Sequence, residues 1–560
     1  MAKDYSKLEK DDLLKVIENM ESRKKYGLIW DEEKTKEQFE KESGNALPVL
    51  KEIKGKEIKT DPAKPTNILI EGDNYHSLSV LNYTHQGKVD VIYIDPPYNT
   101  GNKDFKYNDN FVEKDDAYRH SKWLSFIGKR LQIAKSLLKN DGAIFISIDD
   151  NEFAQLKLLC DDIFGEDNFV DCISWDKKSS AKGVPPKNMV VNVHEYILVY
   201  QINSSFSFIG EPRNLSGFSN PDNDPRGPWR NTNIKSTVKD KSLAFTITDP
   251  ETKIIYTDTW AFSKNELERL IEEKYLIFPK NKDGQVRRKE FFNEFKNSNI
   301  PIKSSWGLFD NQKNTEMLKK ILPNVTFLNP KPIELMKYLL KAVAKNNAII
   351  LDFMAGSGTT GHAVLELNKE DGGSRQFILC TNNELNGFEK ELREQGLSEK
   401  EIQEHGICRR VTYPRIEKTI KGYKTPKGEK IDGLGGNLKY FKTSFVKNSI
   451  SRDDLKLRIT RECTEMLCLR EGIFDEVKVK PDYHIFEQNG RIMAVYYALE
   501  QNGLEQLKKE LDKMKGEKIL YCFTLDPLGL DKKNFAGWEG VNFEAIPQPI
   551  LDIYKEIYNL

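Results

Sequence analysis

Residues 89–101 read VDVIYIDPPYNTG, a buried strand with an abrupt polar end. Val89–Ile94 is an apolar, β-branched run of the kind that fills a strand inside a sheet. Asp95 ends this run, and two prolines follow it. Because proline has no N–H to donate to a neighbouring strand, the strand has to stop here. The stretch therefore places a carboxylate, two rigid residues and an aromatic ring, Tyr98, at the exit of a strand.

Strands and helices alternate around this stretch. Apolar spacing predicts a strand from Asn67 that ends at Gly72-Asp73, further strands at 89–94 and 143–148, and helices at 75–85, 123–139 and 149–164. The alternation is lost after Phe169. It resumes with helices at 332–344 and 356–367 and strands at 348–352 and 376–380. Such alternation is typical of a parallel sheet with crossover helices, so we expect one α/β domain interrupted by a long insert.

The length of 560 residues predicts several domains. By composition and pattern we divide the chain into six parts. The first three are an N-terminal helical region (1–62), a first α/β half (63–170) and an insert (171–325). The last three are a second α/β half (326–386), a charged insert with a Gly/Lys-rich linker (387–436) and a smaller α+β C-terminal domain (437–560).

Bulk properties narrow the class of protein. The net charge is +0, so a polyanion partner has to be inferred from local charge. No apolar run approaches the roughly 20 residues that span a bilayer, and the charged N-terminus lacks a signal-peptide pattern. Seven cysteines without CxxC spacing indicate reduced thiols, and no metal site is expected. These features predict a cytoplasmic protein without a membrane segment.

A glycine-rich turn follows the strand predicted at 348–352. Residues 348–361 read AIILDFMAGSGTTG, so Gly356, Gly358 and Gly361 form a G-x-G-x-x-G pattern. Such glycines let the backbone approach a ligand at the carboxyl edge of a parallel sheet. No lysine follows them, which excludes a Walker loop. Taken alone, the pattern fits a dinucleotide, another adenosyl ligand or a plain tight turn.

The DPPY stretch indicates chemistry on the amino group of a nucleobase. That amino group is a poor nucleophile because its lone pair is delocalised into the ring. Asp95 can accept one of its N–H groups and the carbonyl of Pro96 the other, while Pro96 and Pro97 keep both acceptors fixed. Tyr98 can stack on a base that has left the duplex. The alternative is a Pro-Pro turn that merely ends a strand.

The combination of DPPY with DFMAGSGTT at 352–360 resembles the amino-group DNA methyltransferases that use S-adenosylmethionine. The order, DPPY first and the glycine loop later, resembles their beta class. DPPYNTGNKDFKYNDNF, Gly72-Asp-Asn74, Asn329–Pro332, CTNNE at 380–384 and VTYPR at 411–415 are similar to the Mod subunit of Type III restriction–modification systems. The resemblance implies a Rossmann-like methyltransferase fold in permuted motif order, with target recognition in residues 171–325.

The resemblance also implies roles for individual residues. In it, the catalytic loop is Asp95, Pro96, Pro97 and Tyr98. Residues expected near the cofactor are Asp73, Asn74, Asn329, Lys331, Pro332, Asp352, Phe353, Met354, Ala355, Gly356, Ser357, Gly358, Thr359, Thr360 and Glu384. Many beta-class enzymes have a glutamate directly at the end of the second strand, whereas Thr381 stands there in this chain and Glu384 comes later.

Local charge bears on DNA binding. Residues 177–241 contain ten Lys/Arg and five Asp/Glu. Arg226, Trp229 and Arg230 are candidates for contacts with phosphates and base edges, and Lys103, Lys106 and Tyr107 for holding the nucleotide beside DPPY. The alternative for both groups is a solvated surface.

The resemblance implies double-stranded DNA as substrate, and a Res helicase and endonuclease as possible partner; we also expect a homodimer. The expected target is the N6 amino group of adenine. One alternative target is the N4 amino group of cytosine. Another alternative is that the chain acts mainly as a DNA-specificity subunit for a partner.

Overall fold

The computed structural model describes residues 28, 30, 35, 37, 46–102, 104–108, 110–179, 189–214, 216–237, 240–279, 284–295, 299–325, 327, 329–385, 389–449, 451–500, 503–526, 529–530 and 535–558. The chain divides into two compact units. The first comprises residues 1–207 and 303–560, and the second comprises residues 208–302.

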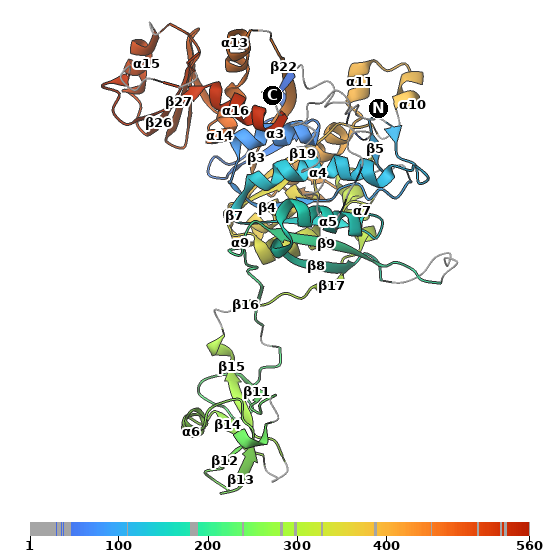
Figure 1. The fold of residues 1–560 in the computed structure, drawn as a ribbon, viewed down its shortest axis with the longest axis vertical. Helices are drawn as coiled ribbons and strands as arrows, with labels where there is room; N and C mark the ends of the chain where they lie inside the picture. Colours follow the sequence, from blue (N-terminus) through green and yellow to red (C-terminus); the bar gives the residue numbers. More distant parts are fainter. Residues whose placement is uncertain are drawn as a thin grey trace, which may run out of the picture. The chain divides into compact units, whose positions relative to one another are not determined.

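The first unit is built on one large sheet (Figure 1). In spatial order its strands are β1 (Ala46–Glu52), β22 (Asn437–Lys447), β3 (Thr66–Glu71), β19 (Gln376–Thr381), β18 (Ile349–Asp352), β4 (Val89–Ile94), β7 (Leu138–Ile148), β9 (His194–Gln201), β8 (Phe169–Asp176) and β17 (Ser305–Leu308), with β2 (Ile58–Lys59) paired to β22. Pairing is parallel from β22 through β7. Strand β9 is antiparallel to both of its neighbours.

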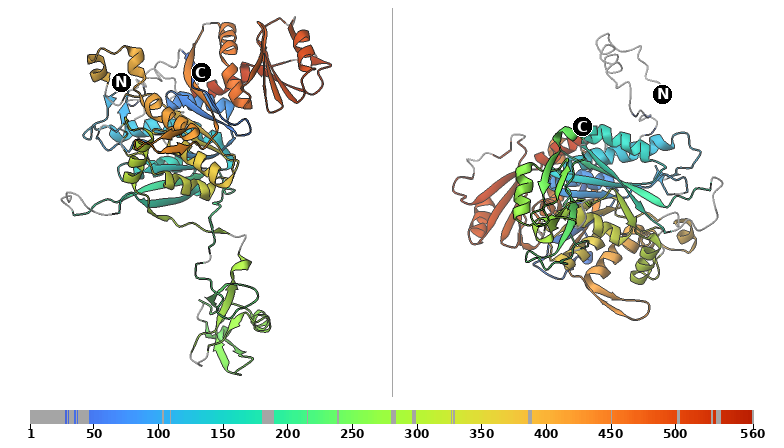
Figure 2. Two further views of the ribbon diagram at one scale, coloured as in Figure 1. Left: turned by 180° about the vertical axis from the view of Figure 1, so that it is seen from behind. Right: turned by 90° about the horizontal axis from the view of Figure 1, so that it is seen from below.

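Helices cover both faces of this sheet. α3 (Asn74–Thr84), α4 (Arg119–Leu137) and α5 (Phe153–Phe164) form one layer, and α8 (Ile333–Val343), α9 (Thr359–Asp371) and α12 (Tyr413–Lys421) form the other (Figures 1 and 2). Parallel strands need such crossover helices, which bury both faces of the sheet. This three-layer arrangement is a Rossmann-like α/β fold, as predicted.

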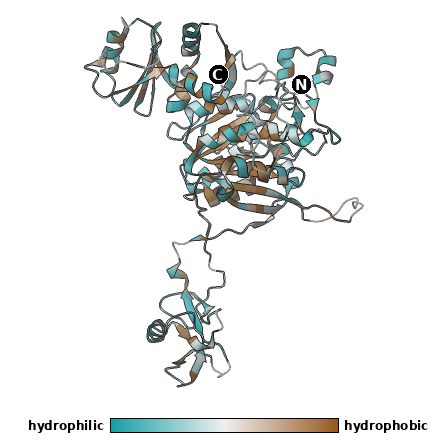
Figure 3. Ribbon diagram, in the orientation of Figure 1, coloured by the Kyte–Doolittle hydropathy of each residue, from teal (hydrophilic) through white to brown (hydrophobic). Residues whose placement is uncertain are grey.

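The apolar runs of the sequence form the core of this sheet. Val91, Ile92 and Tyr93 of β4 and Ile350 and Leu351 of β18 are at most 2% exposed. Hydrophobic residues accordingly concentrate on the central strands (Figure 3). Burial on both faces explains why these strands have nearly continuous apolar sequences instead of alternating ones.

Most predicted elements around the two chemical motifs are confirmed. The strand at 89–94 has its predicted bounds, whereas β7 begins earlier than predicted, at Leu138. The helix predicted at 356–367 begins only at Thr359, because Gly356 and Gly358 adopt φ of 47° and 77° in the turn before it. Left-handed φ is favourable for glycine and interrupts a right-handed helix.

The helical prediction for residues 1–62 is wrong at its C-terminal end. Residues 46–59 contain strands β1 and β2, separated by a 3₁₀ turn at Lys54–Lys56; most of residues 1–45 lie outside the described residues. β1 pairs along its whole length with β22. Leu47, Val49 and Leu50 are buried there, so tertiary packing overrides the polar, helix-like composition.

The boundary predicted at residue 437 also needs correction. β22 lies inside the main sheet, between β1 and β3, so the sheet is completed by the C-terminal third of the chain. The predicted linker contains the hairpin of β20 (Gly422–Lys424) and β21 (Lys430–Asp432). The charged insert contains two short helices, α10 (Glu389–Glu394) and α11 (Glu399–Gln403).

The remaining C-terminal residues form a second, smaller sheet with its own helices. Its order is β23 (Glu476–Val479), β24 (Tyr483–Gln488), β25 (Arg491–Tyr496), β26 (Glu517–Phe523) and β27 (Val541–Ile546), accompanied by α13 (Arg452–Glu462), α14 (Thr464–Glu471), α15 (Leu504–Leu511) and α16 (Gln548–Tyr558). α14 and α16 pack on α3 of the main layer. The predicted α+β character is confirmed for this part.

The insert is shorter than the predicted 171–325. Strands β8, β9 and β17 and helix α7 (Asn311–Ile321) belong to the first unit, because they extend the main sheet or cover it. The second unit, residues 208–302, contains β10 (Glu211–Pro212), β11 (Trp229–Asn233), β12 (Phe245–Thr248), β13 (Ile255–Asp258), α6 (Lys264–Glu272), β14 (Leu276–Ile277), β15 (Arg287–Phe291) and β16 (Asn299–Ile300). It has its own core around Ile234, Trp260 and Leu267.

Candidate active site

Four neighbouring parallel strands end at one edge of the main sheet. β3, β19, β18 and β4 are consecutive in the sheet and run in the same direction. Their carboxyl ends lead into Asp73, Asn382–Glu384, the glycine loop and Asp95 respectively. Ligands of open α/β sheets bind outside this edge. The predicted cofactor and catalytic segments, more than 250 residues apart in sequence, therefore lie side by side.

Side chains of α4 and of Glu152 hold the DPPY loop in place. The Trp123 indole donates to the Pro97 carbonyl over 2.7 Å. Asn99 adopts a left-handed φ of 55°, and its amide donates to the buried Glu152 carboxylate over 2.5 Å. Arg119 in turn donates to the Asn99 carbonyl over 2.9 Å. These contacts fix the loop while leaving its other face open.

Both proposed acceptors of the loop remain available. The Asp95 side chain is 31% exposed, although it follows a strand in which every residue except Asp90 is buried. No hydrogen bond joins the Pro96 carbonyl to another residue in the part of the chain that the structure describes. Acceptors on a fixed loop are already oriented for an incoming N–H donor.

Lys331 reaches this loop instead of the glycine loop. Its ammonium lies 3.2 Å from an Asp95 oxygen, 2.6 Å from the Tyr98 hydroxyl and 2.6 Å from a Glu195 oxygen. It also lies 4.8 Å from the centroid of the Tyr98 ring. Glu195 comes from β9, within the stretch that the sequence assigned to target recognition. The structure thus adds Glu195 to the candidate site and places Lys331 next to the catalytic loop.

The charges in this cluster compensate one another. Partial burial raises the pKa of Asp95, and the Lys331 ammonium acts against that rise. Burial disfavours the charged form of Lys331, but Asp95 and Glu195 outweigh it and hold the Lys331 pKa above its ordinary value. For Glu195 burial is likewise outweighed by Lys331, so its pKa is lowered. Each buried ion is therefore paired, as desolvated charges require.

A cavity opens beside this cluster. It has a volume of about 640 Å³ and is lined by Lys177, Lys178, Ser179, Asp310, Asn311, Gln312, Thr315 and Asn329. The Lys177 ammonium also lies 3.3 Å from the second oxygen of Glu195, which connects the cavity with the catalytic loop. Asn329 has a left-handed φ of 50° and precedes Lys331, and Pro332 is the N-cap of α8.

The glycine loop after β18 is stabilised by Asp352. This side chain is 3% exposed and accepts hydrogen bonds from the Met354 N–H over 3.0 Å and the Thr360 hydroxyl over 2.6 Å. Burial raises the Asp352 pKa to about 7, against the effect of both hydrogen bonds. Asp352 therefore shapes the loop between strand and helix, and each of its carboxylate oxygens accepts a hydrogen bond from the loop or from α9.

The other residues of the loop differ in exposure. Phe353, Ala355, Ser357, Thr359 and Thr360 are buried, whereas Met354 and Gly356 are half-buried. A Cβ at Gly361 would lie 2.9 Å from Ile416 and Leu379 side-chain atoms, so this glycine permits close packing of α9. The half-buried backbone around Gly356 is the part of the loop that a ligand can approach.

Arg415 supports the glycine loop from the opposite side. Its fully buried guanidinium donates to the Ser357 carbonyl, the Ser357 hydroxyl and the Thr359 hydroxyl over 3.2, 3.0 and 2.9 Å. Burial lowers the Arg415 pKa to about 9. Thr412 donates to the Gly356 carbonyl over 2.6 Å. In the sequence, VTYPR at 411–415 carried only a resemblance, and no local pattern predicted this contact.

Asp73 and Asn74 form the end of the edge beside β3. Asp73 caps α3 by accepting from the Tyr75 N–H over 2.8 Å. The buried Arg130 guanidinium lies 3.3 Å from the other Asp73 oxygen and donates to the Asn74 side chain. Since 38% of the Asp73 side chain is exposed, its carboxylate is both fixed and accessible.

Glu384 is half-buried and has contacts within its own part of the chain. Its carboxylate accepts from the neighbouring Asn382 amide, and its carbonyl from the Ile407 N–H over 3.0 Å. Glu71, at the end of β3, is instead the buried acid at this edge, and Arg409 lies 2.7 Å from it. Burial disfavours ionised Glu71, but Arg409 and Tyr440 lower its pKa overall.

The residues predicted to contact DNA near DPPY have mainly internal contacts. Tyr107 is 6% exposed and its hydroxyl donates to the Thr35 carbonyl. The Lys106 ammonium lies 5.0 Å from the Phe111 ring. Lys103 lies outside the described residues.

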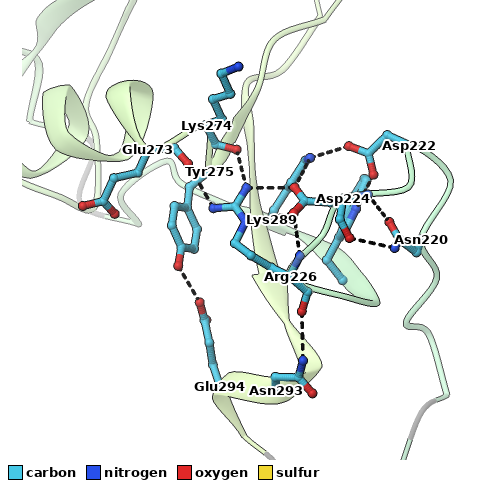
Figure 4. A network of polar contacts seen from close by, with 11 residues as sticks. Asn220, Asp222, Asp224, Arg226, Glu273, Lys274, Tyr275, Lys289, Asn293 and Glu294 are labelled. Atoms are coloured by element: carbon cyan, nitrogen blue, oxygen red, sulfur yellow. Dashed lines mark hydrogen bonds and ion pairs between the residues drawn. The ribbon is translucent and has the colours of Figure 1, made fainter.

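In the second unit, Arg226 is the centre of an internal network (Figure 4). Its guanidinium donates to Asp224 over 2.9 and 2.8 Å and to the Glu273 and Lys274 carbonyls over 2.9 and 3.2 Å. Trp229 donates to Asp222 over 2.8 Å, and Arg230 to Glu290 over 2.6 Å. These three predicted DNA contacts are therefore paired within the unit.

Among the described residues no group of three or more His, Cys, Asp or Glu side chains is arranged to hold a metal ion. Within the same ranges no helix has the length and apolar character needed to cross a membrane.

Comparison with known proteins agrees with this geometry. Residues 89–393 match the N6/N4 family described as DNA methylase. The chain is 34% identical to the Mod subunit of the Type III enzyme StyLTI from Salmonella typhimurium over 56% of this chain and 52% of that protein. It is 31% identical to the EcoPI Mod subunit of Escherichia phage P1 over 70% of each chain. It is 36% identical to the Type II methyltransferase M.KpnI of Klebsiella pneumoniae over 56% of this chain and 79% of that one.

The fold and the site define a methyltransferase, with a Rossmann-like sheet that brings a glycine loop beside DPPY. The family match spans more than half of the chain, and the chain therefore belongs to the DNA methylase family. The family predicted from the sequence motifs is confirmed. The match to the StyLTI Mod subunit spans about half the length of that protein.

Proposed function

We propose that this chain transfers a methyl group from S-adenosylmethionine to the N6 amino group of adenine in double-stranded DNA, as a cytoplasmic Mod subunit. The observation that carries the proposal is the position of Asp95. Its accessible carboxylate stands on a fixed loop, beside the glycine loop of the adjacent strand, and already accepts a hydrogen bond from a nitrogen donor. Relatives named Type III Mod subunits support this choice.

The residues at the sheet edge fit an adenosyl ligand that has an amino-acid end. The half-buried turn at Gly356 has a left-handed φ, which brings backbone close to a ligand, and the exposed Asp73 carboxylate offers an acceptor for hydroxyl or amino groups. We assign the loop 353–358 and Asp73 to the cofactor. When bound there, S-adenosylmethionine supplies an electrophilic methyl group.

The chain's own contribution is the activation of the amino group. Asp95 accepts one N–H of the target and the Pro96 carbonyl accepts the other, which localises the nitrogen lone pair. As the nitrogen forms its bond to the methyl carbon and the thioether leaves, the nitrogen gains positive charge, and the fixed Asp95 carboxylate would stabilise that charge until the nitrogen loses its surplus proton to solvent. The Tyr98 ring stacks against the base after it leaves the duplex.

We assign target recognition to the second unit, residues 208–302. It folds around its own core and adds no strand to the catalytic sheet. Its β11–β15 pair carries Asn231 and Arg287, for which no side-chain partner occurs among the described residues. Amide and guanidinium groups are those that recognise adenine and guanine edges. Arg226, Trp229 and Arg230 would support this surface through their internal pairs.

Incubation of the chain with labelled S-adenosylmethionine and DNA tests the proposal. Wild-type protein should label the DNA, and Asp95→Ala should abolish labelling because the amino group loses its charged acceptor. Circular dichroism should show that the variant remains folded. Undiminished labelling by Asp95→Ala would falsify the role of Asp95.

The Asp95 and Pro96 acceptors also fit the N4 amino group of cytosine, which carries the same pair of N–H donors. The identity of the methylated base therefore has to be measured. Mass spectrometry of nucleosides from methylated DNA should detect N6-methyladenine; N4-methylcytosine in its place would replace the adenine assignment.

The partners form the last part of the proposal. We propose a homodimer that associates with a Res subunit, because residues 451–558 form a further sheet and helices that the chemistry does not use. Light scattering should report twice the mass of one chain. Co-purification with a large ATPase from the native host should identify the Res partner; if none co-purifies, a solitary methyltransferase is the alternative outcome.

A further inference from the structure

Lys331 makes both contacts that the proposed mechanism reserves for the target base. Its ammonium is a nitrogen donor 3.2 Å from the Asp95 carboxylate. It also lies over the Tyr98 ring, 4.8 Å from the ring centroid, where the base would stack. A base cannot reach Asp95 and Tyr98 in this arrangement unless the ammonium gives up at least one of these contacts.

Glu195 provides a second position for this ammonium. The Glu195 oxygen nearest Lys331 lies 2.6 Å away, closer than Asp95, and accepts from the Tyr98 hydroxyl over 3.1 Å. Only 8% of the side chain is exposed in both Lys331 and Glu195. An unpaired charge at such a depth would be strongly unfavourable. With Glu195 present, Lys331 can leave Asp95 and still remain paired.

We propose that Lys331 and Glu195 are positioning residues of the methyl-transfer site. Lys331 occupies the place of the target amino group on Asp95 in the free enzyme, and Glu195 retains the ammonium when the base displaces it. This inference rests on the proposed function of Asp95.

Lys331 and Glu195 also influence the charge that faces the reacting nitrogen. Asp95 and Glu195 carry one negative charge each and Lys331 one positive charge, so these three groups sum to −1; the Lys177 ammonium, 3.3 Å from the other Glu195 oxygen, offsets the charge of Glu195 further. The Asp95 carboxylate is then the negative charge that complements the positive charge developing on the amino nitrogen. Without Lys331 the sum is −2, and Asp95 retains a proton to higher pH. Without the charge of Glu195 the sum is 0, and Asp95 becomes the only carboxylate partner of the ammonium.

Other titratable groups surround Asp95 and Glu195 and stay unchanged in the variants that test this proposal. Tyr93, Tyr98 and Asp352 of β18 interact with Asp95, whereas Asp149 after β7 and Lys177 after β8 interact with Glu195. Differences between variants in the pH dependence of activity therefore report on Lys331 and Glu195.

The test is steady-state methylation of DNA by wild type, Lys331→Met, Lys331→Arg and Glu195→Gln between pH 5.5 and 9. Lys331→Met should shift the acidic limb of kcat/KM for DNA upward by about one pH unit or more, because Asp95 loses its cation. Lys331→Arg keeps the charge and should restore the wild-type limb.

Glu195→Gln should behave differently from Lys331→Met. Its acidic limb should move to lower pH or stay in place, because a competing carboxylate is lost. Its KM for DNA should rise by about tenfold, because the ammonium now stays on Asp95 and competes with the base. A fluorescent 2-aminopurine placed at the target position should show a smaller increase on binding than with wild type.

Matched controls are Lys341→Met and Glu370→Gln, which remove the same groups from an exposed pair on α8 and α9. Neither should change the pH profile. If Lys331→Met and Glu195→Gln both lose activity without moving the acidic limb, or move it in the same direction, the inference is overturned. If Lys331→Met does not fold, the pH profiles of Lys331→Arg and Glu195→Gln test the inference. Wild-type labelling that depends on Asp95 would still support the proposed function in either case.

Discussion

Asp95 and Asp352 are two aspartates at the carboxyl ends of adjacent parallel strands, Asp95 directly after β4 and Asp352 as the last residue of β18, yet their surroundings give them opposite tasks. Asp352 is almost fully buried and saturated by Thr360 and Met354. Asp95 is 31% exposed, and its partners are the side chains of Lys331 and Tyr98. A carboxylate saturated by its own loop shapes that loop, whereas one held by a displaceable cation can accept a ligand. The difference shows that partners, more than strand position, decide the role of an acid at a sheet edge.

The largest expected effect is that of Asp95→Asn on catalysis. The amide keeps the shape of the side chain but loses the charge that faces the reacting nitrogen, so kcat should fall by about 100-fold or more. The free energy of unfolding should change by less than about 1 kcal/mol, since Lys331 keeps Glu195 as partner. Methylation rates and urea denaturation measure the two quantities. If the loss of activity were accompanied by an equally large loss in the free energy of unfolding, Asp95 would be a structural residue like Asp352.

Asp352→Asn should show its effect in the pH dependence of stability. The folded-state pKa of Asp352 is raised to about 7 by burial, above its ordinary value of 3.8. Native protein therefore holds this proton more tightly than unfolded protein, and the resulting stability is present at low pH and lost as pH rises through 7. Because asparagine does not titrate, the free energy of unfolding of wild type minus that of the variant should fall by a few kcal/mol between pH 4 and pH 8.

Urea denaturation at several pH values measures this difference. Asp432→Asn is the matched control, because it makes the same chemical change at a side chain that is 86% exposed. A flat difference for Asp352→Asn would mean that its carboxylate is hydrated in the native protein, as that of Asp95 partly is.

Sequence alone predicted the strands and the loops but not the partners that distinguish these two acids. Both motifs follow from local patterns: an apolar run, then either Asp-Pro-Pro or small residues with glycines. Glu195 was not predicted as a site residue, because its strand, HEYILVYQ, was assigned to the insert. The apolar run within this strand nevertheless indicates a strand of the main sheet. Lys331 was assigned to the cofactor from resemblance, and no local pattern determines which way its long side chain points.

Arg415→Met should affect the glycine loop without affecting Asp95. The change leaves the Ser357 carbonyl and the Ser357 and Thr359 hydroxyls without their donor, and should lower the free energy of unfolding by about 1–3 kcal/mol. The KM for S-adenosylmethionine should rise severalfold, because the loop is less well fixed. Arg415→Lys should recover part of both effects. An increase in the KM for DNA alone would show that Arg415 acts on the Asp95 side of the edge.

Thr360→Val should have the smallest effect, and it tests how Asp352 is held. Valine has nearly the shape of threonine but cannot donate to the Asp352 carboxylate. A hydrogen bond to an ionised acceptor is stronger than one to a neutral acid, so the loss of stability should grow with pH as Asp352 ionises, to about 1–2 kcal/mol at pH 8. The same loss at pH 5 and pH 8, measured by urea denaturation, would indicate that the hydroxyl contributes by packing. In that case the protonation of Asp352 would not distinguish it from Asp95.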